Sequence, residues 1–189
     1  KKSLFSNVLR CTIMENNSTI QQNLNFQGIV RNVGDYYGAR HIAAHCHDET
    51  ELVYVMDGSC KSSFDGQNGA PLTASAGMAF LIPPHTLHNQ SGRCSTTYIT
   101  MELPPEDVPP EPLLLDLRSD PYLLHWCHDL VKLWYKPLGA EGSFLAGAIW
   151  QRILPVYRTT QAGAPLLPEA IRQALCFLER NLHNKITVA

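Results

Sequence analysis

Short apolar runs, each closed by residues that favour turns, fill the stretch from residue 26 to residue 103. One such run, residues 51–56, is rich in valine and is closed by Asp57-Gly58. Many short strands with frequent turns are typical of an all-β sandwich or barrel, so a mainly β domain is predicted over residues 1–103, with residues 1–25 as an N-terminal arm. The other expected turns are Gly66-Gln67-Asn68-Gly69, Ser75-Ala76-Gly77 and Pro83-Pro84, the last of which ends residues 78–82.

A proline-rich stretch separates this β region from a helical one. Residues 104–112 contain five prolines in nine positions, which disfavours helix and central strand and predicts an extended connector over residues 104–119. Beyond it, apolar residues recur every three or four positions, which predicts a helical segment over residues 120–185. The apolar positions of three expected helices are Leu123, Leu124, Cys127, Leu130, Val131 and Trp134; Phe144, Leu145, Ala148, Ile149, Ile153, Val156 and Tyr157; and, after Pro168, Ile171, Ala174, Leu175, Leu178 and Leu182.

Composition and charge exclude several classes of protein. Hydrophobic residues make up 44% and charged residues 17% of the chain, as in a globular domain. The net charge is −2 and the fifteen lysines and arginines are scattered, so these 189 residues are a poor candidate to bind nucleic acid alone. The sequence contains no apolar run of about 18 residues, the length that a transmembrane helix needs. Six widely spaced cysteines without a Cys-x-x-Cys pair indicate reduced thiols and a cytoplasmic location.

Residues 45–51, His-Cys-His-Asp-Glu-Thr-Glu, carry the first group of chemically reactive side chains. Residues two apart in a strand point to the same face about 6.7 Å apart, so His45 and His47 can converge on one ion. In a straight strand Glu51 would lie about 13 Å from His47, too far to share that ion. A turn through the polar residues 48–50 would bring Glu51 back beside the histidines.

The second group follows the Pro83-Pro84 turn, where a returning strand can bring His88 inward as a fourth ligand. Three imidazoles and one carboxylate suit a divalent transition metal such as Zn, Ni, Mn or Fe(II), with room left for water or substrate. His85 is expected to lie outside this site, because its odd offset from His88 turns it to the other face of an extended chain.

These two groups resemble the two motifs of the cupin family. His-x-His, three residues, Glu, six residues and Gly58 is similar to the first motif, and Gly77 followed by Pro83 and His88 is similar to the second. The resemblance implies a cupin barrel, or double-stranded β-helix, in which His45, His47, Glu51 and His88 stand where metal-binding cupins hold their ion. The chain departs from the pattern at three positions: Gly38 is out of register, His85 replaces a glycine, and Gly92 replaces an asparagine.

A narrower resemblance covers almost the whole chain. The segment from His45 to Gly58, then Gly77 to His88, then the helices, resembles the effector-sensing half of AraC-type transcription regulators. Residues 174–189 resemble the segment that leads into their DNA-binding helices, with residues 186–189 starting the linker. The resemblance implies a cytoplasmic sensor and dimerisation domain that binds a small-molecule effector, is not an enzyme, and contacts DNA only through a missing helix-turn-helix domain.

Alternatives to this interpretation remain at the level of the sequence. The four residues of the expected site can hold a divalent metal, recognise an organic ligand, or serve structure. A small metal-dependent cupin enzyme, such as a dioxygenase or isomerase, is the alternative function. The third expected helix presents one apolar stripe, which predicts a homodimer interface, although the stripe can also pack on its own barrel. The residues of that interface are Ile171, Leu175, Leu178 and Leu182.

Overall fold

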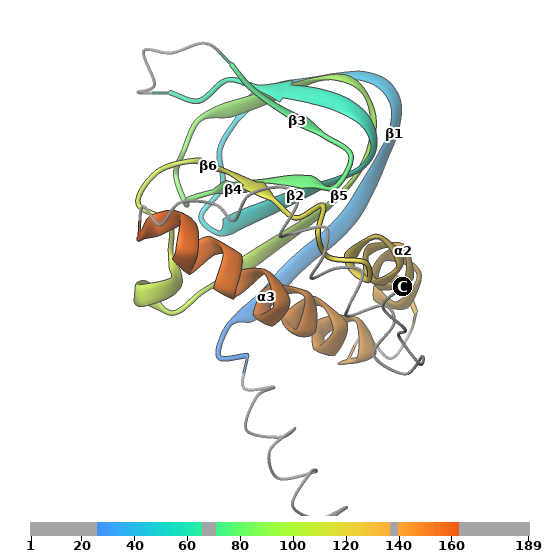
Figure 1. The fold of residues 1–189 in the computed structure, drawn as a ribbon, viewed down its shortest axis with the longest axis vertical. Coiled ribbons are helices and arrows are strands. Elements are labelled where there is room, and N and C mark those ends of the chain that lie inside the picture. Colours follow the sequence, from blue (N-terminus) through green and yellow to red (C-terminus); the bar gives the residue numbers. More distant parts are fainter. Residues whose placement is uncertain (1–25, 66–70, 137–139, 163–189) are drawn as a thin grey trace, which may run out of the picture.

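The computed structural model describes residues 26–65, 71–136 and 140–162 and contains one antiparallel sheet covered by two helices (Figure 1). The strands are ordered β1-β5-β2-β4-β6, and β3 pairs with β2 beside this path. The predicted mainly β fold with a following helical segment is therefore confirmed. The strands are β1 (Ile29–His45), β2 (Thr50–Ser62), β3 (Leu72–Ser75), β4 (Met78–Ile82), β5 (His88–Glu102) and β6 (Leu113–Asp116), and the helices are α2 (Leu123–Trp134) and α3 (Ala140–Gln161).

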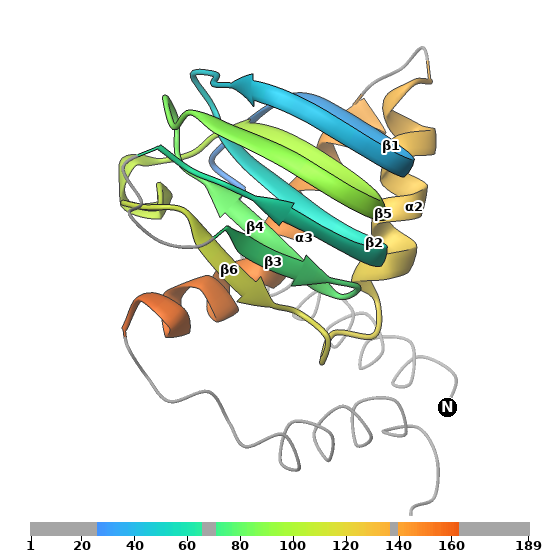
Figure 2. The same cartoon turned by 90° about the horizontal axis from the view of Figure 1, so that it is seen from above.

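The first half of β2 is buried on both of its faces, which explains its nearly continuous apolar sequence. Side chains alternate between the two faces of a strand. One face of the sheet packs against α2 and α3, as Figure 2 shows, and the other faces the barrel interior. Burying a polar side chain between two apolar layers costs free energy, so a carboxylate in this strand is unusual. Leu52, Tyr54 and Met56 lie on the helix side, and Glu51, Val53 and Val55 lie on the interior side.

The predicted strand end at Asp57-Gly58 is wrong, because β2 continues through it to Ser62. The pairing of β2 with β5 shifts register between Val55 and Asp57, and Gly58 has a φ of 75°. A Cβ at this position would lie 2.3 Å from the Arg93 carbonyl oxygen. A β-bulge at Met56, followed by the close approach of Gly58 to β5, therefore lets the strand continue where the sequence alone suggested a turn. The turn at Gly77 is present, with a φ of 82°.

The sheet extends beyond residue 103, into the predicted connector. Residues Pro105–Asp107 form a short 3₁₀ helix, and β6 then pairs with β4, with Leu115 opposite Ala79. Proline interrupts a strand by removing a backbone donor, but the last proline of this segment is Pro112, so β6 is free to pair. The connector predicted at residues 104–119 thus contributes an edge strand.

The two described helices fall where the three- and four-residue spacing predicted them. Asp120 accepts hydrogen bonds from the backbone N–H groups of Tyr122 (2.9 Å) and Leu123 (3.3 Å), which stabilises the start of α2. The same carboxylate pairs with Arg152 of α3, whose guanidinium lies 4.9 Å from the centre of the Tyr122 ring. One arginine therefore ties the two helices together.

Several predicted features fall outside the described residues: the arm at 1–25, the turn at 66–69, and the third helix with its stripe Ile171, Leu175, Leu178 and Leu182. Within the described ranges, neither helix combines the length and hydrophobicity that crossing a bilayer requires.

Candidate metal and ligand site

The structure brings His45, His47, Glu51 and His88 together at one end of the barrel. His45 ends β1 and lies directly opposite His88, which begins β5. The expected turn after His47 is present and returns Glu51 to the histidines, so that Glu51 Oε2 lies 3.3 Å from His47 Nε2 and 3.1 Å from His88 Nε2. One ligand atom from each of the four residues lies within 4.8 Å of the other three. Such spacing allows all four to contact a single ion.

Each of the three imidazoles is oriented by a backbone carbonyl that lies two residues away along the chain. A carbonyl oxygen only accepts hydrogen bonds, so in the neutral ring Nδ1 carries the proton and Nε2 keeps its lone pair. Metal-binding histidines are commonly held in this way by an outer hydrogen bond. The Nδ1 contacts are His45 to Ala43 O (3.0 Å), His47 to Glu49 O (2.9 Å) and His88 to Thr86 O (2.8 Å).

Glu51 and His88 are the two cluster residues whose burial makes an unpaired charge or polar atom costly. Glu51 is 8% exposed and His88 is 3% exposed. Burial alone would raise the pKa of the Glu51 carboxyl, but the adjacent imidazoles of His47 and His88 lower it to about 2. His88 Nε2 is not aligned for a hydrogen bond with Glu51 and has no other partner in the described part of the chain. A buried ionised carboxylate beside an unsatisfied imidazole nitrogen fits a bound divalent cation, which would satisfy both.

Between about pH 6 and pH 8, the stability of the metal-free protein is expected to fall with rising pH, whereas the stabilisation by bound metal is expected to grow. The hydrogen bond to Glu51 raises the pKa of His47 above its ordinary value. A raised pKa stabilises the folded state below the ordinary value of about 6.5, and this stabilisation is lost as pH rises through the folded pKa. Metal binding needs the neutral imidazole, so it strengthens as pH rises and stabilises the protein by linkage.

Melting curves recorded with chelator and with excess Zn²⁺ test this prediction. The zinc-induced rise in melting temperature should grow from about pH 6 to about pH 8. His47→Ala should flatten both responses. Curves that shift in parallel with pH, with and without zinc, would contradict it.

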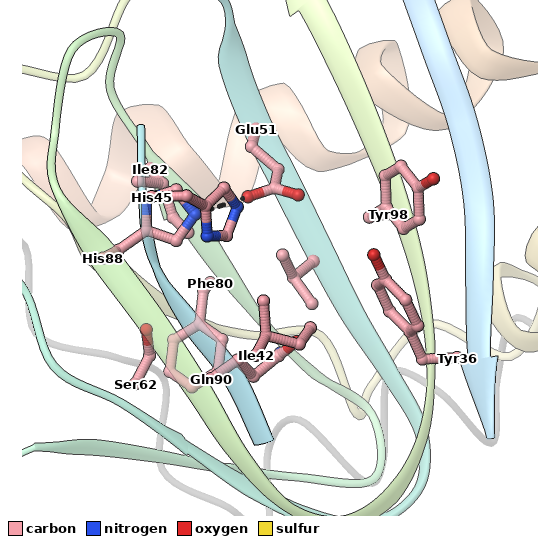
Figure 3. A pocket seen from close by; sticks show the side chains of 11 residues that line it. Tyr36, Ile42, His45, Glu51, Ser62, Phe80, Ile82, His88, Gln90 and Tyr98 are labelled. Carbon is pink, nitrogen blue, oxygen red and sulfur yellow. Dashed lines mark ion pairs between the residues drawn. The ribbon is translucent and has the colours of Figure 1, made fainter. Parts of the chain in front are cut away.

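The cavity beside the cluster is small and is walled partly by tyrosines (Figure 3). Its volume is about 20 Å³, close to what one or two water molecules need. Tyr36 of β1 and Tyr98 of β5 stack with ring centres 5.3 Å apart, on the far side of Glu51 from the histidines. Gly34 makes room for Tyr98, because a Cβ there would lie 2.3 Å from the phenol oxygen.

Sequence reasoning missed this tyrosine wall, because only strand pairing places it beside the motif residues. Gln90, Ser62, Ile42 and Phe80 also line this cavity (Figure 3). Their spacing along the chain carries no signal of a shared site.

A family model and a number of solved structures are similar to this chain. The model described as AraC-like ligand binding domain matches residues 26–154. No curated protein matches the chain significantly. The protein YhaK from Escherichia coli is 17% identical, with 49% of this chain and 44% of YhaK covered and a TM-score of 0.38. A cupin-2 domain protein from Shewanella frigidimarina is 26% identical, with 35% of this chain and 64% of that protein covered and a TM-score of 0.30.

Bacillus subtilis oxalate decarboxylase, a protein with Mn(II) centres, is 18% identical, with 38% of this chain and 21% of that chain covered and a TM-score of 0.31. The match to this chain thus covers less than two thirds of each of these three proteins. The family match extends over more than half of the sequence, from the start of the described sheet to the middle of α3. The chain therefore belongs to the family of AraC-like ligand-binding domains.

Proposed function

We propose that this chain is the sensor domain of an AraC-type transcription regulator and that it holds one divalent metal on His45, His47, Glu51 and His88. The observation that carries the proposal is the orientation of the ligand atoms. Each of the three imidazoles is fixed through Nδ1, which leaves Nε2 as the nitrogen that can face an ion, and the carboxylate lies 3.1 Å and 3.3 Å from two of these Nε2 atoms. When bound, the ion would supply a positive centre that attracts an oxygen-bearing effector.

The cavity is too small to hold an organic effector without a change in structure. Pockets for drug-sized organic ligands typically enclose about 300–1,000 Å³. The cavity beside Glu51 is about 20 Å³, so an organic effector must enlarge it, by separating the tyrosine wall from the histidines or by opening the barrel end. A sensor needs such a difference between free and bound states, because a ligand shifts an equilibrium only by binding one state better.

Elemental analysis of protein purified without an affinity tag tests the metal part of the proposal. We expect near-stoichiometric Zn, Ni, Mn or Fe, and its loss in His47→Ala. Metal-free protein that still binds an organic effector would assign the cluster to ligand recognition instead. Chemical conversion of an added ligand by the metal-loaded protein would favour the alternative function, a small metal-dependent cupin enzyme.

The proposal places the domain in a cytoplasmic regulator that contacts DNA through a helix-turn-helix domain outside these 189 residues. The charge pattern supports this, because the fifteen lysines and arginines are scattered and form no basic cluster along the sequence. Residues 120–185 are proposed to supply the dimer contact that brings two such DNA-binding domains to paired half-sites.

Leu178→Glu is expected to convert a homodimer into folded monomers. The stripe Ile171, Leu175, Leu178 and Leu182 lies outside the described residues, so the proposal rests on its helical spacing. A charge in the middle of an apolar interface leaves an unpaired group that association would bury. Sedimentation velocity should show the change with unaltered circular dichroism, and Gln173→Glu, off the stripe, should stay dimeric. Wild-type protein that is monomeric at tens of micromolar would refute the interface.

A further inference from the structure

His85 has a backbone conformation that an L-residue rarely adopts. Its φ is 59°, and it is the one non-glycine residue with a positive φ among those described. The left-handed region is disfavoured for residues with a Cβ, and glycine is the usual choice there. The imidazole gains little by packing, since 75% of the side chain is exposed. A strained position that keeps a histidine therefore points to a use for the side chain at the surface.

The His85 side chain faces one partner, the carboxylate of Asp48. Its Nδ1 lies 3.3 Å from Asp48 Oδ1, and the Asp48 side chain is 89% exposed. The backbone N–H of His85 also donates a hydrogen bond to the carbonyl of His47, at 2.8 Å. The pair thus joins the two loops that carry the ligands His47 and His88, on their solvent side.

The pair also lies next to the groups that orient those ligands. Asp48 precedes Glu49, whose carbonyl accepts from His47 Nδ1, and His85 precedes Thr86, whose carbonyl accepts from His88 Nδ1. An exposed imidazole and an exposed carboxylate are therefore each held one residue from a carbonyl group that orients a cluster histidine.

We propose that His85 and Asp48 form a capture site for divalent cations, from which the ion passes to the cluster of His45, His47, Glu51 and His88. This inference rests on the proposed metal function. Two ligand atoms about 2.0–2.1 Å from a tetrahedral ion lie about 3.3–3.4 Å apart, which matches the observed separation. A site with two protein ligands open to water binds weakly and exchanges quickly, as a transfer site must. The exposed carboxylate also attracts cations to this end of the barrel.

A capture site changes rates and leaves the equilibrium unchanged. Because the ion would enter and leave by the same route, losing the pair should slow metal binding and release by the same factor. A pair that only fastened the two loops together would instead stabilise the bound state, and its loss would weaken the affinity.

Stopped-flow mixing of metal-free full-length chain with Zn²⁺, and of zinc-loaded protein with chelator, separates these cases. Asp48→Asn removes the charge without altering the strained backbone, and His85→Asn keeps a residue that tolerates positive φ. Both variants should bind and release zinc about tenfold more slowly, with an affinity within about twofold of wild type. His128→Ala, which removes an exposed imidazole from α2, should change neither rate.

Unchanged rates in both variants, or a loss of affinity with an unchanged association rate, would overturn the capture site. Wild-type protein that binds no zinc would overturn the metal proposal and this inference together. Either of the two variant outcomes would overturn the capture site alone, so the two failures are distinguishable. His85→Gly gives an independent readout in metal-free protein. Its melting temperature should rise by about 2 °C as the strain is relieved, and a fall would remove the premise that His85 is kept at a cost.

Discussion

Glu51→Gln is expected to lower the affinity of the barrel for a divalent metal by at least about 100-fold. Losing an outer hydrogen-bond partner of a metal ligand typically costs about 10–100-fold, and loss of a charged ligand should exceed that range. Glu51 is the one anionic member of the cluster, and its Oε2 lies between two imidazole nitrogens at 3.3 Å and 3.1 Å. A neutral amide keeps the shape of the side chain but removes the charge that the ion would neutralise.

Competition titration against a chromophoric zinc chelator measures the loss directly, and elemental analysis of the purified variant gives an independent value. Glu111→Gln is the matched control, because it makes the same chemical change on an exposed side chain outside the cluster. It should bind metal as wild type does. Equal affinities in Glu51→Gln and wild type would show that the cluster does not hold the ion through its carboxylate.

Trp150→Ala is expected to lower the free energy of unfolding by about 3–5 kcal/mol. Trp150 is 1% exposed, and its ring centre lies 6.1 Å from that of Tyr157 on the same helix. Truncation would leave a large cavity in a well-packed core, and a domain of this size is stable by only about 5–15 kcal/mol. The apolar cluster around it joins the sheet to the helices through Leu52, Leu81, Ile99, Met101 and Leu115 on the strands and Leu123, Leu130, Ile149 and Ile153 on the helices.

Urea unfolding followed both by tryptophan fluorescence and by far-ultraviolet circular dichroism tests this prediction. Because one cluster spans both layers, the two signals should change together in wild type and variant alike. Phe144→Ala, on the same helix but 64% exposed, should change stability by less than about 0.5 kcal/mol. Separate transitions for sheet and helices, or a loss below about 1 kcal/mol in Trp150→Ala, would show that the helices are not part of the same core.

Features that depend on neighbouring residues were predictable from the sequence. The sequence placed His45 and His47 close together, although β1 ends at His45 and His47 lies in the loop that follows it. Polar residues 48–50 supplied the turn that returns Glu51 to them. The three- and four-residue spacing of apolar side chains located α2 and α3. The position of His88 opposite His45 was predictable from the Pro83-Pro84 turn and the motif spacing. In each case the geometry of a few consecutive residues restricts the structure strongly.

Features that depend on which strands pair were decided only by the tertiary structure. Asp57-Gly58 lies inside a strand, after a bulge at Met56, because β5 pairs along β2 on both sides of it. Strand β6 forms because β4 offers a free edge to residues that follow the last proline. The pairing of β1 with β5 places Tyr36 and Tyr98 against each other, and the two ligand loops place His85 against Asp48. These contacts join residues far apart in the sequence, such as Tyr36 and Tyr98, which are 62 positions apart. Local periodicity carries no information about such distant partners, which are selected by the free energy of the whole packed barrel.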